Sequence, residues 1–154
     1  MSTHTSSEQK PRPSRGAKAL ERLFTGAQTS LYRLSGGAMG GRMGKSPILL
    51  LTTTGRKSGQ KRTQPVLYLV DGTRWIIVAS NGGSPVHPAW WFNLTTNPGA
   101  EVQIGRQKIP VTATTATPEE RARLWPLLVA MFPRYMDYQK KVSREIPVVI
   151  LSPV

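Results

Sequence analysis

The segment from residue 52 to residue 62, TTTGRKSGQKR, combines residue types that bind anionic ligands. Its cationic and hydroxyl side chains, with no acidic residue among them, include Arg56, Lys57, Ser58, Lys61 and Arg62. Gly55 and Gly59 permit a tight turn and a close approach of the backbone to a ligand. Arg and Lys supply charge-assisted hydrogen bonds to phosphate or carboxylate oxygens. The segment therefore predicts an anion-binding turn, with a solvated basic hairpin tip as the alternative.

A second segment places small and aromatic residues after a predicted strand. It begins with SNGG at residues 80–83 and continues through PAWWFNL at residues 88–94. Trp90 and Asn93 are three residues apart, so they share a helix face where an indole and an amide would line a flat aromatic ring. Trp91 and Phe92 are candidates for core packing. His87 lies in a loop, where exposure is the simpler expectation than catalysis.

The third segment, FPRYMDY at residues 132–138, places Tyr135 and Tyr138 three residues apart after a proline. Their hydroxyls could face one pocket and donate a hydrogen bond to a developing oxyanion, although packing at a helix edge is the alternative. The chain has no cysteine, no G-x-S-x-G motif and two histidines, His4 and His87, which are far apart. An enzyme of this kind must obtain its reactive group from a cofactor, and no metal site is expected.

Length and charge narrow the function further. The 154 residues suit one domain, and 38% hydrophobic with 19% charged residues argues against global disorder. The formal net charge of +13 indicates a polyanionic partner: nucleic acid, an acidic lipid surface or an anionic small molecule. Residues 1–18 predict a disordered basic arm without a secretory signal, residues 19–154 predict a single domain, and the expected location is the cytoplasm.

The pattern of apolar runs and turn residues predicts an α+β fold that is mainly β. Asp71-Gly72 and Gly105-Arg106 mark hairpins, while Thr117 and Glu120 form a capping box at a helix start. Six antiparallel strands favour a closed barrel, since closure removes exposed edges. The expected strands are 47–54, 62–70, 74–80, 100–104, 108–114 and 146–151. The expected helices are 17–34, 88–94, 117–132 and 134–143, with a glycine-rich linker over 36–44.

Three segments in order, PILLLTTTGRKSGQKRTQPVLYL, VASNGGSPVHPAWWFNLTTNP and MFPRYMDYQ, resemble the deazaflavin-dependent nitroreductase family, small reductases that use coenzyme F-420. The resemblance extends from about residue 19 to residue 149. It implies a six-stranded antiparallel split β-barrel with peripheral helices. It also implies transfer of a hydride from the reduced deazaflavin to a quinone or a nitro-aromatic acceptor.

The resemblance also assigns roles to individual residues. Contacts to the phosphate and the oligoglutamate tail fall on Arg56, Lys57, Ser58 and Arg62. The ring and its ribityl chain would be contacted by Pro65, Val66, Leu67, Ser80, Asn81, Gly82, Trp90 and Asn93. The acceptor would be surrounded by Tyr68, Tyr135 and Tyr138. Relatives often carry lysine where this chain has Asn81, which bears on how the ring edge is polarised.

Three other interpretations stay open from the residues. A related split-barrel protein would use FMN instead of the deazaflavin. A nucleic-acid-binding module would need exposed aromatic residues interleaved with cations, and no such stripe is visible around Trp75, Trp90, Trp91 and Trp125. The basic arm and the helix predicted over 17–34 suggest peripheral membrane contact, which would suit a quinone substrate and is compatible with catalysis.

Overall fold

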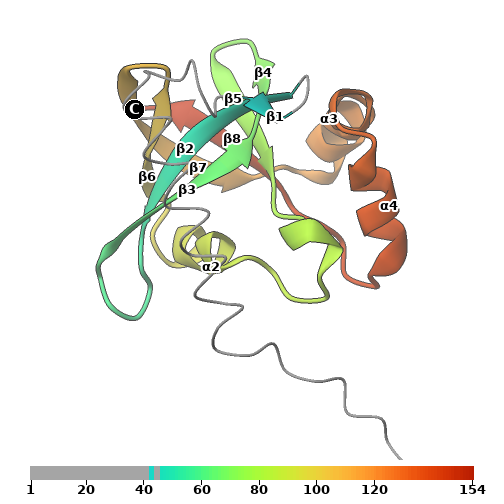
Figure 1. The fold of residues 1–154 in the computed structure, drawn as a ribbon, viewed down its shortest axis with the longest axis horizontal. Helices are drawn as coiled ribbons and strands as arrows, with labels where there is room; N and C mark the ends of the chain where they lie inside the picture. Colours follow the sequence, from blue (N-terminus) through green and yellow to red (C-terminus); the bar gives the residue numbers. More distant parts are fainter. Residues whose placement is uncertain (1–41, 44–45) are drawn as a thin grey trace, which may run out of the picture.

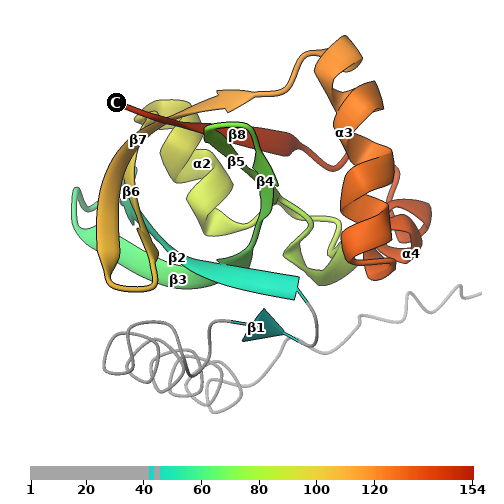
Figure 2. The same ribbon diagram turned by 90° about the horizontal axis from the view of Figure 1, so that it is seen from above.

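The computed structural model describes residues 42–43 and 46–154, and the account below concerns these residues. The elements in chain order are β1 (Arg42–Met43), β2 (Ser46–Thr54), β3 (Lys61–Leu67), β4 (Leu69–Asp71), β5 (Arg74–Val78), the 3-10 turn η1 (Asn81–Gly83), α2 (Ala89–Thr96), β6 (Gly99–Ile104), β7 (Gln107–Thr115), α3 (Pro118–Met131), α4 (Arg134–Lys141) and β8 (Val148–Pro153). The strands curl into a barrel, α2 closes one end, and α3 and α4 lie together on one side (Figures 1 and 2).

The barrel is closed by a strand that bends. Antiparallel pairing connects β2, β6, β7, β8, β5 and β4 in that order, and β3 pairs with the other edge of β2. Tyr68 alone separates β3 from β4, and its N–H donates to the carbonyl of Pro47 at 3.1 Å. Residues 61–71 therefore pass from β2 to β5 and complete the ring. The predicted antiparallel barrel is confirmed, but the described sheet has eight strands instead of six, because β1 is added and one predicted strand is divided at Tyr68.

The first hydrophobic core fills the barrel. Side chains on a strand alternate between faces, so every second residue of β2, β5 and β8 points inward. α2 adds Trp90 and Leu94 to this core and so acts as a plug. The buried members are Leu49, Leu51, Ile77, Ala79, Trp90, Leu94, Val102, Val111, Val149 and Leu151.

A second core lies between the outer face of β5 and β8 and the helices α3 and α4. It uses the alternate residues of the same two strands, such as Val148 and Ile150 of β8. The helices contribute Leu124, Leu128 and Tyr135. Because β5 and β8 serve both cores, the helical layer is part of the same folding unit as the barrel.

Local signals in the sequence determine how the turns and helices begin. Gly72 adopts a φ of 63° in the β4–β5 hairpin, which favours glycine at this position. Thr117 and Glu120 form the predicted capping box, with both hydrogen bonds at 3.2 Å. The Asp71 carboxylate accepts hydrogen bonds from Arg123 and Arg74, which lower its pKa to about 2. This carboxylate ties the β4–β5 hairpin to α3.

Several predicted boundaries differ from the structure. The strand predicted over 74–80 ends at Val78, because Ser80 turns into the right-handed region at φ −77° and ψ −31°. The last strand begins at Val148 instead of Ile146, since Pro147 has no N–H for a strand ladder. The linker predicted over 36–44 contains β1, a two-residue strand that pairs with β2.

Two predictions lie outside the described residues: the basic arm over 1–18 and the helix over 17–34. The division into an arm and a domain beginning at residue 19 therefore stays a prediction. Within the described part of the chain, none of the helices combines the length and the apolar character that a membrane crossing requires.

Candidate functional site

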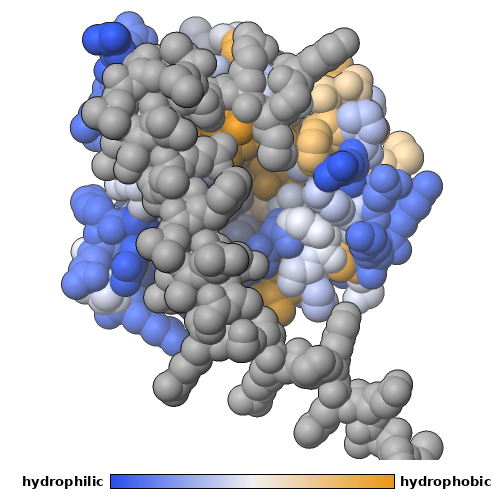
Figure 3. Space-filling view, viewed as in Figure 1, coloured by the Kyte–Doolittle hydropathy of each residue, from blue (hydrophilic) through white to orange (hydrophobic). Residues whose placement is uncertain are grey.

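The turn between β2 and β3 presents cations to solvent. Gly55 donates to the carbonyl of Gln60 at 2.8 Å, and a Cβ on Gly55 would lie 2.7 Å from the Ser58 hydroxyl and 3.2 Å from the Gln60 carbonyl oxygen, so the turn leaves little room for a side chain there. We call residues 55–62 the basic turn. Its exposed cationic and hydroxyl side chains are Arg56, Lys57, Ser58, Lys61 and Arg62. Hydrophilic residues gather at the lower left of Figure 3, where Figure 1 places this turn.

The cations of the basic turn have no acidic partners among the described residues. The ion pairs among the described residues lie elsewhere: Arg74, Arg121 and Arg123 pair with Asp71, Glu120 and Glu145. Within residues 42–43 and 46–154, the positive charge of the basic turn is therefore not paired with an acidic side chain. This arrangement suits a phosphate or carboxylate ligand, because a charge-assisted hydrogen bond forms without first breaking an ion pair.

Asn93 anchors the basic turn to α2. Its side-chain oxygen accepts from the N–H of Arg56 at 3.0 Å, and its amide donates to the Thr53 hydroxyl at 3.1 Å. The Arg56 guanidinium also lies over the Phe92 ring, 4.4 Å from its centroid. Asn93 is 6% exposed, and its two hydrogen bonds connect α2 to the end of β2 and to the basic turn.

The two tryptophans of α2 lie at different depths. Trp90 and Asn93 share a helix face as predicted, but that face points into the molecule, and Trp90 is 5% exposed within the barrel core. Trp91 and Phe92, which the sequence offers to the core, are half-buried, and Trp91 packs against the first core. Trp91 packs against His87 with ring centroids 5.5 Å apart. Trp90 therefore has little surface left for a ligand ring.

The strand β3 runs from the basic turn toward Tyr68. Pro65, Val66 and Leu67 on this strand are half-buried, and β3 pairs only with β2 among the described strands. Proline is tolerated on such a strand, because it pairs with a neighbouring strand on one side only. Tyr68 is half-buried and packs against the barrel core.

After β5, residues 80–84 form a loop that we call the glycine loop. Asn81, Gly82 and Gly83 all have positive φ, at 47°, 64° and 79°. Asparagine tolerates the left-handed region better than most residues, which gives a structural reason for Asn81 at this position. The Asn81 amide donates to the carbonyl of Val86 at 2.9 Å. Ser80, at the start of the loop, is buried.

The glycine loop packs closely on α4. A Cβ placed on Gly83 would lie 3.0 Å from Cδ1, 3.2 Å from Cα and 3.3 Å from Cβ of Tyr138. The structure thus brings together two segments that the sequence offers as separate site elements, the loop with Ser80, Asn81 and Gly82 and the helix with Tyr138. Only glycine allows this approach.

Tyr135 and Tyr138 are neighbours with different surroundings. Their ring centroids lie 6.5 Å apart, yet Tyr135 is 3% exposed within the second core, while Tyr138 is half-buried. Burial raises the pKa of the Tyr135 hydroxyl far above its usual value, with a smaller contribution from Tyr138. Of the two, Tyr138 is the better placed to meet a ligand.

Sequence analysis did not identify Arg144, which lies between α4 and β8. Its guanidinium donates to the carbonyls of Ala79, Ser80, Ser84 and Val86 and to Nδ1 of His87. His87 is half-buried, and burial, followed by the Arg144 charge, lowers its pKa. No local pattern distinguishes Arg144 from a solvated cation, because its partners are distant backbone oxygens.

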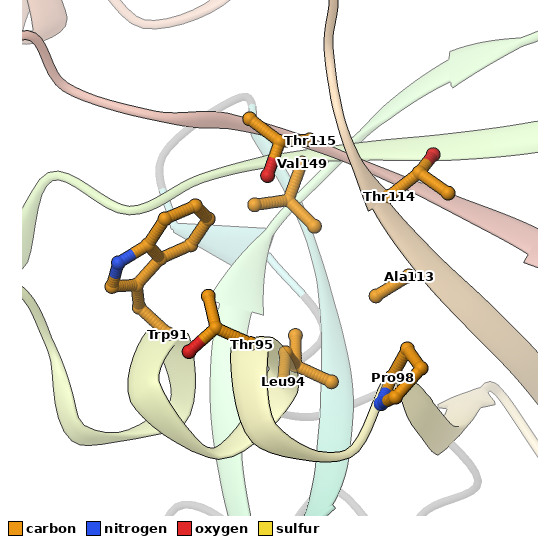
Figure 4. Close-up of a pocket in the computed structure, with 8 residues that line it drawn as sticks. All are labelled: Trp91, Leu94, Thr95, Pro98, Ala113, Thr114, Thr115 and Val149. Atoms are coloured by element: carbon orange, nitrogen blue, oxygen red, sulfur yellow. The ribbon is translucent and has the colours of Figure 1, made fainter.

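A cavity of about 310 Å³ lies between α2 and strands β7 and β8 (Figure 4). In the close-up, Trp91, Leu94 and Thr95 of α2 face Val149 of β8. The lining is completed by Pro98, Ala113, Thr114 and Thr115. No residue that the sequence offers for the site lines this cavity.

The described part of the chain is a small antiparallel barrel plugged by a helix, which defines a split-barrel protein. Its exposed basic turn and the glycine loop beside the tyrosine-bearing helix α4 suit an anionic ligand. The family model described as F420H(2)-dependent quinone reductase matches residues 25–153. The chain belongs to this family, and the resemblance to deazaflavin-dependent reductases is confirmed.

Individual relatives agree with this assignment. The chain is 42% identical over 127 residues to an F420H(2)-dependent quinone reductase of Mycobacterium tuberculosis, covering 80% of this chain and 85% of that protein. A protein of Mycobacterium bovis named as a putative enzyme of the same kind matches with the same identity and coverage.

Solved structures show the same fold. One described as an F420-H2 dependent reductase is 45% identical with a TM-score of 0.64, covering 69% of this chain and 94% of that one. A second, described as a domain-swapped dimer, is 38% identical with a TM-score of 0.65 and covers 89% of this chain and 96% of that one.

Proposed function

We propose that this protein is a reductase that uses coenzyme F-420 to reduce a quinone. The observation that carries the proposal is the basic turn, whose cations have no ion pairs in the described structure and whose backbone is anchored to α2 through Asn93. A coenzyme with a phosphodiester and several carboxylates requires such a turn. Family membership supplies the kind of coenzyme.

In this proposal, each segment of the site has one task. Arg56, Lys57, Ser58 and Arg62 hold the phosphate and the carboxylate tail. Pro65, Val66 and Leu67 of β3 line one side of the ring, and Ser80, Asn81 and Gly82 of the glycine loop hold its polar edge. When bound, the reduced coenzyme supplies a hydride to the acceptor, which leaves negative charge on an acceptor oxygen.

Tyr138 and Tyr68 are the residues we assign to that oxygen. A neutral tyrosine hydroxyl donates a hydrogen bond to an oxyanion and can deliver a proton to it directly or through water. Tyr135 has the less direct task of supporting Tyr138, because it is almost fully buried and its hydroxyl has a raised pKa. The main contribution of the protein is to place donor and acceptor about 3–3.5 Å apart.

The decisive experiment follows the absorbance of reduced F-420 in the presence of the protein and menadione, with NADPH as the control donor. Rapid oxidation of reduced F-420 by menadione, with no oxidation of NADPH, supports the proposal. Oxidation of NADPH with bound FMN would favour the flavin-dependent alternative, and parallel assays with a nitro-aromatic acceptor would test that wider substrate range.

The nucleic-acid alternative finds little support in the geometry. Trp75, Trp91 and Trp125 are half-buried and Trp90 is buried, so no exposed indole is available for stacking on bases. Tight binding of an oligonucleotide by a protein that ignores F-420 would overturn the proposed function.

A further inference from the structure

The Arg144 side chain holds a loop that has little regular secondary structure. Its nitrogens donate to the carbonyls of Ala79 at 3.2 Å, Ser80 at 3.0 Å and Ser84 at 3.0 and 3.1 Å. The guanidinium also lies 3.0 Å from Nδ1 of His87 and, in a longer contact, 3.5 Å from the carbonyl oxygen of Val86. One side chain thus gathers the backbone oxygens from both ends of the glycine loop.

The chemistry of arginine makes these contacts directional. Arginine stays protonated and has only donors, so Nδ1 of His87 must accept and the proton of a neutral His87 must sit on Nε2. The planar guanidinium offers donors in a fixed fork, which lysine does not reproduce. The loop oxygens are therefore held in one arrangement instead of several.

This arrangement directs the N–H groups of the loop. In a trans peptide the N–H points opposite to the C=O, so the Ser80 and Asn81 N–H groups point away from the guanidinium that binds the Ala79 and Ser80 carbonyls. Neither N–H has an acceptor within the described part of the chain. Ser80 is right-handed and Asn81 left-handed, a succession that turns neighbouring N–H groups toward a common side.

We propose that Arg144 is a positioning residue for the coenzyme ring. It fixes the glycine loop so that the N–H groups of Ser80 and Asn81 donate to an electron-rich atom on the polar edge of the ring. Arg144 touches neither coenzyme nor acceptor. The inference rests on the proposed function, because it concerns the same loop and the same ligand.

Arg121 provides a matched control. It is also a half-buried arginine that donates to a backbone carbonyl, that of Ile146 at 3.1 Å, and to the Gln139 side chain at 3.2 Å. Its guanidinium lies over Trp125 and pairs with Glu145. None of these partners belongs to the glycine loop, so its loss tests general destabilisation.

The experiment compares Arg144→Met with Arg121→Met at a temperature where circular dichroism shows both to be folded. We expect Arg144→Met to weaken F-420 binding in a fluorescence titration by about 10- to 100-fold, since misplaced contacts of about 1 Å cost on that order. Arg121→Met should stay within about 2-fold of wild type, because its contacts are separate from the loop. The KM for menadione, measured at saturating coenzyme, should change much less than the coenzyme affinity in both variants.

Hydrogen exchange of the ligand-free proteins gives a readout that is independent of the coenzyme. The amides of residues 80–84 should exchange faster in Arg144→Met than in wild type and Arg121→Met. Unchanged F-420 affinity in Arg144→Met, or equal losses in both variants, would overturn the proposal and leave Arg144 with a purely structural role.

Arg144→Lys covers the case in which Arg144→Met does not fold. It keeps the charge and loses the fork, so weaker F-420 binding with faster exchange in the loop supports the proposal, and wild-type affinity overturns it. A wild-type protein that does not bind F-420 would overturn the proposed function as well. Wild-type binding with an unaffected Arg144→Lys variant would overturn only the positioning role.

Discussion

The basic turn and the glycine loop, which we propose bind opposite ends of the coenzyme, are built by different physical means. The basic turn carries exposed cations that form no ion pairs within the described residues, and Asn93 anchors its backbone at Arg56. The glycine loop carries no charged residue, and Arg144 fixes its backbone by donating hydrogen bonds to the carbonyls of Ser80 and Ser84. Charge attracts a flexible anionic tail over some distance, whereas orienting a ring requires donors whose positions are fixed.

The largest effect is expected for Gly83→Ala, which tests whether the glycine loop must pack closely on Tyr138. The new Cβ would meet Tyr138 at 3.0–3.3 Å, and φ is 79°, so we expect unfolding to become easier by about 2–3 kcal/mol. Urea unfolding measures this loss. Gly72→Ala is the control, since it has a positive φ but nothing within 4 Å of its Cβ, and its cost should be about 1 kcal/mol. Similar losses in the two variants would show that Gly83 and Tyr138 do not need their close approach.

The double variant Lys57→Ala with Arg62→Ala tests the contribution of the basic turn to coenzyme binding. We expect F-420 binding to weaken by about 1.5–3 kcal/mol, with a larger effect at low salt, and the fold to stay intact. Fluorescence titration at two ionic strengths measures it. Arg106→Ala with Lys108→Ala removes the same charge from the exposed β6–β7 hairpin. If this control weakens binding equally, net charge and not the basic turn attracts the coenzyme.

A smaller effect is expected where the two neighbouring tyrosines are compared. Tyr138→Phe should lower kcat by about 10-fold with little change in coenzyme affinity, since it removes a donor to the acceptor oxygen. Tyr135→Phe should change kcat by less than about 3-fold, because the buried hydroxyl acts only through packing. Steady-state kinetics with menadione separates them. A larger loss in Tyr135→Phe would reverse the assignment.

The smallest expected effect is on pH dependence. The folded protein lowers the pKa of His87 below the ordinary 6.5, because His87 is partly desolvated and faces Arg144. The neutral form is thus favoured in the fold, and its stabilising effect is complete above pH 6.5 and declines as the pH falls through the lowered pKa. The thermal midpoint should therefore fall on acidification from pH 7 to pH 5, and His87→Gln should reduce this slope. An identical slope in the variant would rule out a contribution from the His87–Arg144 contact.

Much of the fold could be predicted because its signals are local. Asp71-Gly72 indicates a hairpin through the φ that glycine allows, and Thr117 with Glu120 marks a helix start through hydrogen bonds three residues apart. The bend at Tyr68 could not be predicted, since it depends on β3 leaving β2 for β5. The same apolar run would suit one straight strand.

The site shows the same limit. The cations of the basic turn are visible in the sequence, as are the glycines near Asn81. Spacing correctly indicates that Trp90 and Asn93 share a face, but only the packing of α2 decides that this face is interior. Arg144 is absent from any local pattern because its partners lie 57 to 65 residues away.

The shared strand β8 has a consequence for tolerance to mutation. Val149 and Leu151 face the barrel interior while Val148 and Ile150 face the helices, so a slip by a single residue would exchange the two sets. Insertions or deletions in β8 should therefore be far more damaging than conservative replacements along it. The register of β8 therefore fixes the position of α3 and α4, and with it that of the tyrosines of α4, relative to the barrel.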